Sequence, residues 1–141
     1  MPKHSRTVDA LFTVAECVMI LALVLLEIAS GYRAGIMHHL YFFKRDYLMT
    51  IYHPDVLVYH QAGIAVCIGV SAYCCYAGWR TIGAKPLIRH GILALSLVSC
   101  YSIPWFAELN TFAHLLIVLE CSLIVETVRL VFLFRSHLRP E

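Results

Sequence analysis

Residues Ala10–Gly31 read ALFTVAECVMILALVLLEIASG, an apolar run that is interrupted only by Glu16 and Glu27. Because an α-helix rises about 1.5 Å per residue, this run is long enough to cross the roughly 30 Å hydrocarbon core of a bilayer. It is also longer than the roughly 7 to 15 apolar residues of a signal peptide. The sequence therefore predicts an uncleaved membrane-spanning helix at about 10–31.

Three further apolar runs of similar length follow the first, at about 56–79, 87–106 and 111–134. The chain is 60% hydrophobic and 14% charged, with a mean hydropathy of +0.74. Soluble domains typically have about 45–50% apolar and about 25% charged residues. We therefore predict an all-α fold: an integral membrane four-helix bundle formed by one domain, residues 1–141.

Two prolines and a row of small side chains refine the predicted spans. Pro54 marks the boundary before the second span, and Pro104 predicts a kink near the end of the third. The second span also carries a row of small side chains at steps of three and four residues, which allow helices to approach closely, either within the bundle or between protomers. These residues are His60, Gly63, Cys67, Ser71, Cys74 and Gly78.

The basic residues that flank the spans are unevenly distributed between the two sides. Eight lie on the side that holds both termini: Lys3, Arg6, Arg80, Lys85, Arg89, Arg129, Arg135 and Arg139. Three lie on the opposite side: Arg33, Lys44 and Arg45. Because lysine and arginine are retained on the cytoplasmic side, we predict a multi-pass protein of a cell inner membrane with cytoplasmic N and C termini.

The connection at 32–55 is polar and rich in aromatic residues. Apolar side chains recur along it at helical spacing, namely Ile36, Leu40, Phe43, Tyr47 and Ile51. This pattern predicts a short interfacial helix between the first and second spans. The segment either caps the bundle or serves as an aromatic anchor among the lipid head groups.

Three residues near span ends fall at one predicted level, within roughly 7 Å of the outer boundary. They are Glu27, His60 and His114. Neutral imidazole groups at this level could bind a b-type haem, a quinol head group or a transition metal. No ligand-spacing motif supports a metal site, and interfacial histidines without a ligand are the alternative interpretation.

Other acidic residues lie deeper in the predicted bundle, where an ionisable group needs a partner. Glu16 and Glu126 come to a similar depth, with Arg129 one turn from Glu126, so they form either an ion-paired helix clasp or part of a proton relay. Glu120 falls roughly 13 Å below the outer boundary, with no basic residue predicted at its level. A polar track from Glu27 past Glu120 to Glu16 is a further hypothesis.

Sequence motifs give no catalytic function. The chain has no Walker loop, metalloprotease motif, dinucleotide fingerprint or nucleophile elbow, so a free-standing enzyme is not predicted. A net charge of +2 does not indicate that the chain binds nucleic acid. We rank first a small subunit or anchor of a larger membrane complex, such as a respiratory electron-transport complex with haem or quinone contact. A cofactor-free membrane interaction protein is second, and a small homo-oligomeric transporter or channel is third.

Overall fold

The computed structural model of the chain describes residues 3–82 and 84–138, and these residues are almost entirely helical. Its helices are α1 (Lys3–Tyr32), α2 (Ala34–Thr50), α3 (Pro54–Ile82), α4 (Ala84–Ser102), α5 (Pro104–Glu108) and α6 (Phe112–Leu138). Of the charges behind the predicted orientation, Arg139 lies outside the described residues. So do the side chains of Lys3, Arg6 and Arg80.

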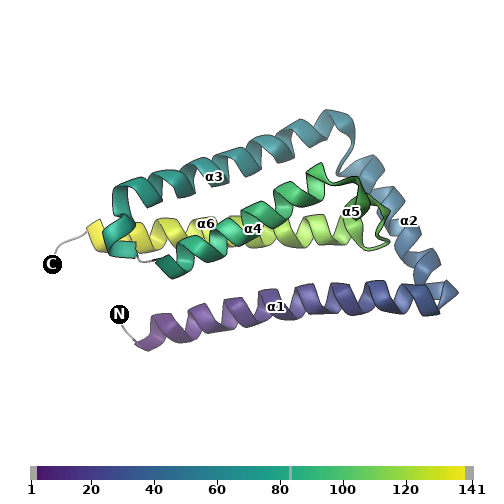
Figure 1. The fold of residues 1–141 in the computed structure, drawn as a ribbon, viewed down its shortest axis with the longest axis horizontal. Coiled ribbons are helices and arrows are strands. Elements are labelled where there is room, and N and C mark those ends of the chain that lie inside the picture. Colours follow the sequence, from purple (N-terminus) through teal and green to yellow (C-terminus); the bar gives the residue numbers. More distant parts are fainter. Residues whose placement is uncertain (1–2, 83, 139–141) are drawn as a thin grey trace.

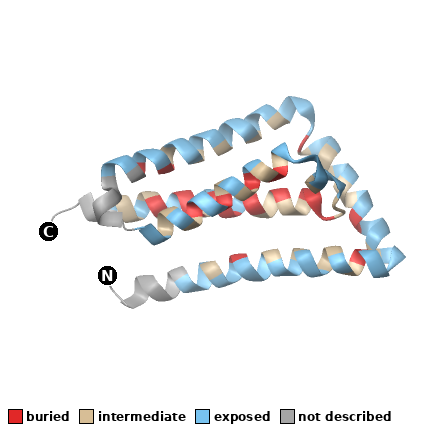
Figure 2. Ribbon diagram, in the orientation of Figure 1, coloured by how far each residue is buried: buried red, intermediate tan, exposed pale blue. Residues whose placement is uncertain are grey.

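Four long helices, α1, α3, α4 and α6, run side by side along the molecule, and α2 lies across one end of them (Figure 1). Helix α6 is central, because it contacts each of the other five helices. Its leucines Leu116, Leu123 and Leu130 recur at seven-residue spacing and are each about 1% exposed. Such spacing places them on one helix face, which packs against the neighbouring helices. Figure 2 accordingly shows most of the buried positions along α6.

Helix α1 has the opposite distribution of polar and apolar side chains from a helix of a water-soluble protein. Among its described side chains the two buried ones, Glu16 and Ser30, are polar. Its large apolar side chains are exposed instead, with Leu11 at 65%, Val14 at 59% and Leu21 at 57%. Exposure of that much apolar surface indicates contact with an apolar partner or with lipid.

Among the described residues, two helices are by length and composition long and apolar enough to cross a membrane: α1 over Ala10–Tyr32 and α3 over Pro54–Cys74. The all-helical part of the predicted fold is therefore confirmed, whereas four membrane spans are not. Helix α6 does not meet the same criterion because Glu120, Glu126 and Arg129 lie close together in it. Charged residues are tolerated in a span where they face other helices and find partners.

The predicted third span, 87–106, is wrong at its end. Instead of a kinked helix, α4 stops at Ser102 and a separate helix begins at Pro104. Ile103 between them is extended, with φ −101° and ψ 112°. The cause is steric, because a residue before proline is disfavoured in the helical conformation while proline itself suits the first position of a new helix.

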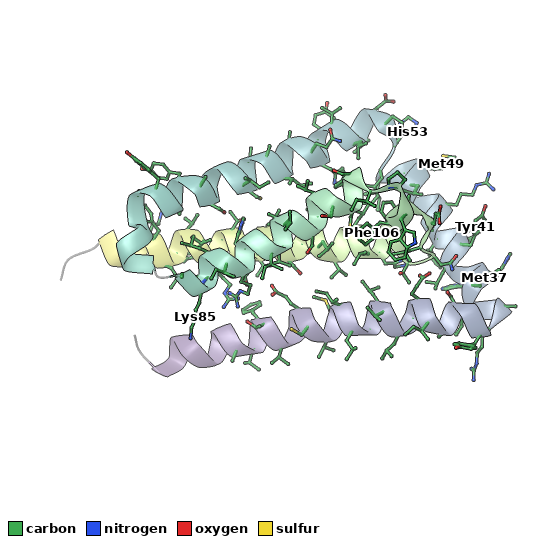
Figure 3. All side chains as sticks on the ribbon, viewed as in Figure 1. Met37, Tyr41, Met49, His53, Lys85 and Phe106 are labelled. Carbon is green, nitrogen blue, oxygen red and sulfur yellow. The ribbon has the colours of Figure 1, made fainter. Side chains whose placement is uncertain are left out.

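The connecting helix α2 is held against the end of the bundle by one apolar and one charged side chain. Leu40 is buried, and Lys44 Nζ donates to the carbonyl oxygens of Ala107 at 2.5 Å and Leu109 at 2.8 Å. Burial lowers the pKa of Lys44, and the nearby carboxylates of Glu27 and Glu108 oppose that shift. On the other face, Tyr41 and Met49 point away from the bundle (Figure 3).

Glu27 joins the end of α1 to the beginning of α6. Its Oε2 accepts hydrogen bonds from the Thr111 backbone N–H at 2.8 Å and from the Thr111 hydroxyl at 2.9 Å, and its Oε1 accepts the Asn110 N–H at 3.1 Å. The first N–H groups of a helix have no partner within that helix, and a negative charge there is favourable. Glu27 therefore caps α6 from another helix.

We expect Glu27→Ala to lower the free energy of unfolding by about 1–2 kcal/mol, because the backbone donors at the start of α6 lose their acceptor. The measurement is reversible unfolding in mixed micelles followed by circular dichroism. Glu108→Ala, at an exposed position, is the matched control and should change stability little. Equal effects of the two substitutions would show that the cap contributes nothing.

Candidate functional site

Glu120 on α6 is bonded by three side chains from different parts of the chain. The Tyr101 hydroxyl of α4 donates to Oε1 at 2.6 Å, and the Tyr52 hydroxyl donates to Oε2 at 3.2 Å. His60 Nδ1 of α3 lies 2.9 Å from the same Oε2. We call Glu120, His60, Tyr52 and Tyr101 the Glu120 cluster. It gives a carboxyl group, which the sequence left without a partner, three neutral hydrogen-bonding neighbours.

The cluster forms because His60 and Glu120 lie at nearly the same distance from their helix starts. Helix α3 begins at Pro54 and α6 at Phe112, so the two residues differ in depth by only about 3 Å. The predicted second span starts at about 56, two residues after the observed start of α3 at Pro54. Depths counted from the predicted start therefore put His60 much closer to the outer boundary than Glu120. Tyr52 packs its ring 4.9 Å from the His60 ring, which helps to fix the imidazole.

The protonation states within the cluster follow from the donor and acceptor pattern. Burial and the neighbouring Glu120 raise the pKa of Tyr52, so its hydroxyl remains a donor. When Glu120 is ionised, neutral His60 donates from Nδ1 to the carboxylate. Nε2 is then an acceptor, oriented in the same way as the imidazoles that carboxylates hold in many enzymes.

His60 and Glu120 line a pocket of about 280 Å³ between α3 and α6, which we call the α3–α6 pocket. Its lining is otherwise mostly apolar and consists of Tyr59, Gly63, Ile64, Cys67, Leu123 and Ile124. Tyr59 and Ile124 are exposed on the outside of the bundle, so the pocket opens toward the molecule's apolar surface.

The row of small side chains on α3 is divided between packing and this pocket. Ser71 and Cys74 are buried, in agreement with a close helix contact. At Gly63, however, an added Cβ would meet no atom within 4 Å, so the small residue there borders open space. No close helix contact within this chain is therefore formed at Gly63, and packing of Gly63 between protomers stays a prediction.

Tyr52 and Tyr101 line a second pocket, of about 220 Å³, at the corner where α4 ends and α5 begins. We call it the corner pocket. Its other lining residues are Leu48, Leu57, Cys100, Ser102, Ile103, Pro104, Ala107, Phe112 and Leu116. Figure 3 shows Phe106 among the side chains gathered at this end of the bundle. The Glu120 cluster thus has its histidine and carboxyl group on one pocket and its two tyrosines on the other.

The structure places the predicted layer of Glu27, His60 and His114 in three different environments. Glu27 caps α6, and His60 bonds Glu120. His114 packs its ring 5.3 Å from the Tyr47 ring, and its buried Nδ1 has no hydrogen-bond partner among the described residues. Within the described part of the chain, no group of three or more His, Cys, Asp or Glu side chains could hold a metal ion.

The structure brings together Glu16, Glu126 and Arg129, the predicted helix clasp. Glu126, 1% exposed, lies 2.5 Å from Arg129 Nη1 and 2.6 Å from Arg89 Nη2, and it is hydrogen-bonded to Glu16. Arg89 also donates to the Thr13 hydroxyl, so it links α4 to both α1 and α6. The contacts join three helices, and no direct hydrogen bond in the described chain connects them to Glu120.

Sequence reasoning did not assign Arg89, Tyr52 or Tyr101 to a site. Arg89 carried a usable signal, because an arginine inside the predicted span 87–106 requires a partner. Tyr52 and Tyr101 gave no signal of a site, since tyrosine is common at the ends of membrane-spanning helices.

Comparisons with known proteins found no match. No family model matches the chain, and the searches of curated proteins and of solved structures also returned nothing similar. Function is therefore inferred from the site alone.

We expect Glu126→Ala to lower the free energy of unfolding by about 3–5 kcal/mol, because Arg89 loses the buried carboxylate that neutralises it. The same micelle unfolding measurement applies. A second substitution, Arg89→Met, made in the Glu126→Ala background, should restore part of the loss. Val128→Ala, at an exposed position of the same helix, is the control. A Glu126→Ala variant as stable as this control would exclude an energetic role for the clasp.

Proposed function

We propose that the chain is an integral membrane protein with four spans and cytoplasmic termini, and that it works as a subunit of a larger membrane complex. We further propose that the α3–α6 pocket binds the head group of a lipid-soluble ligand of the quinone or quinol class. The exposed apolar surface of α1 and the length and apolar character of α1 and α3 support the membrane setting.

The His60–Glu120 pair at the polar end of an apolar pocket carries the ligand proposal. Such pockets bind small molecules when a few polar groups converge among apolar walls. His60 Nε2 can accept a hydrogen bond from a quinol hydroxyl or, when protonated, donate one to a quinone carbonyl. The apolar wall from Gly63 to Ile124 suits a hydrocarbon ring and tail.

Quinone is favoured over haem by the placement of the two candidate histidines. A bis-histidine haem requires two imidazoles directed at one iron, but His114 packs on Tyr47 and does not line the α3–α6 pocket that His60 borders. A Soret band in the purified protein would favour haem instead.

We expect a quinone with a ten-carbon tail to slow the alkylation of Cys67 by N-ethylmaleimide, because Cys67 lines the pocket. Mass spectrometry of the protein in mild detergent measures the rate at each cysteine. The exposed Cys17 and Cys121 report any non-specific effect within the same molecule. Glu120→Gln should weaken protection about tenfold, because His60 loses the charge-assisted hydrogen bond that orients its Nε2 toward the ligand, a loss of about 1.5 kcal/mol.

Two tryptophan substitutions test the location of the ligand. Ile124→Trp places bulk in the pocket and should abolish protection, whereas Val66→Trp places the same bulk on the exposed side of α3 and should not. If quinone leaves the alkylation rate of Cys67 unchanged in the wild type, the pocket does not bind this class of ligand.

The proposed topology predicts opposite labelling at the two ends of the bundle. In a background without the native cysteines, Met49→Cys on α2 should react with a membrane-impermeant maleimide added to intact cells. Lys85→Cys, at the start of α4, should react only after the membrane is permeabilised. Both positions are exposed, so burial does not limit either reaction. Labelling of both from the same side would contradict four spans.

A further inference from the structure

We propose that the Glu120 cluster transfers protons, with Tyr52 and Tyr101 connecting the Glu120 carboxyl group to water in the corner pocket. This inference deepens the proposed function, because it gives a proton of a ligand in the α3–α6 pocket a route to the opposite side of the cluster. It concerns proton exchange alone and requires no electron acceptor.

The hydrogen bonds of Glu120 form a continuous connection between the two pockets. On one side His60 and Glu120 border the α3–α6 pocket. On the other, the hydroxyl groups of Tyr52 and Tyr101 bond Glu120 while the same two residues border the corner pocket. A proton that crosses the cluster therefore moves only between groups already in hydrogen-bond contact.

The corner pocket is large enough and polar enough at the cluster to hold water. Its volume of about 220 Å³ exceeds the roughly 30 Å³ that one water occupies in the liquid. Tyr52, Tyr101 and Ser102 are among its lining residues, and each carries a hydroxyl group with which water in the pocket would form hydrogen bonds. The pocket reaches the surface of the molecule at Ile103, which is 46% exposed, and at Pro104.

The transfer step changes only O–H bonds. In the structure the tyrosine hydroxyl groups donate to Glu120. To release a proton, a tyrosine hydroxyl first turns toward a water molecule. Its oxygen then accepts the proton of the Glu120 carboxyl group while its own proton passes to that water, which becomes hydronium. One proton arrives and one leaves, so the tyrosine ends neutral and Glu120 ends as a carboxylate. The reverse sequence protonates Glu120 from the same water.

The side chains that bond Glu120 can themselves exchange protons. The groups that face it are Tyr52 from the α2–α3 connection, His60 from α3 and Tyr101 from α4, each of which can be neutral. Within the described residues, no lysine or arginine forms an ion pair with Glu120. Glu126 differs, because it forms ion pairs with Arg89 and Arg129. Of the two glutamates, Glu120 is the one suited to gain and lose a proton.

The test is hydrogen–deuterium exchange of the Glu120 carboxyl group in reconstituted membranes, followed by infrared spectroscopy. Acid titration reveals the carboxyl C=O band, and Glu120→Gln assigns it by removing it. On transfer to D₂O the wild-type band should shift within the mixing time. Ile103→Trp, which fills the corner pocket and leaves the cluster intact, should slow the shift about tenfold or more, because exchange then requires local opening.

Further variants separate the proton route from the ligand pocket and from misfolding. The Tyr52→Phe/Tyr101→Phe double variant should slow the exchange like Ile103→Trp, with circular dichroism reporting its fold. Ile124→Trp and Val66→Trp should exchange as the wild type does. Wild-type exchange in Ile103→Trp, or slowing by Ile124→Trp instead, would overturn the proposal. Because no ligand is added, either result is independent of the quinone test.

Discussion

The structure depends on the need of the charged side chains that α6 carries inside the bundle to find partners on other helices. Helix α6 contacts every other helix, and its three charged residues in the bundle, Glu120, Glu126 and Arg129, take partners from α1, α3, α4 and the α2–α3 connection. Unsatisfied charges inside a bundle cost several kcal/mol, so these contacts restrict how the helices can be arranged. Leucine packing along α6 then fills the remaining space, without the same directional requirement.

The sequence predicted the helices well and the contacts between them poorly. Long apolar runs and the helical spacing from Ile36 to Ile51 were sufficient to place α1, α3 and α2, because those signals are local. Pro104 correctly indicated where the helix is interrupted, but the predicted kink was wrong, because a separate helix, α5, begins at Pro104. The partners of Glu120 were not predicted, because depth counted from uncertain span ends is in error by several ångströms, which exceeds the length of a hydrogen bond.

The two glutamates that α6 carries inside the bundle illustrate how neighbouring residues determine the role of one residue type. Glu126 is 1% exposed and forms ion pairs with two arginines, an arrangement that joins helices. Glu120 borders a pocket and has tyrosine and histidine neighbours, which exchange protons more readily than arginine does. Composition alone treats these residues as equivalent, and only the helix arrangement separates a structural carboxylate from one suited to chemistry.

The attachment of α1 connects this arrangement to the proposed place of the chain in a larger complex. Helix α1 is held near one end by Glu16 and Thr13 and near the other by Glu27, while most side chains between them are exposed and apolar. In a bilayer, apolar faces gain little from packing against one another rather than against lipid, so polar contacts such as these set the position of a helix. The exposed face of α1 consequently remains available to lipid or to a neighbouring subunit. The α3–α6 pocket lies on other helices and stays open when that face is covered.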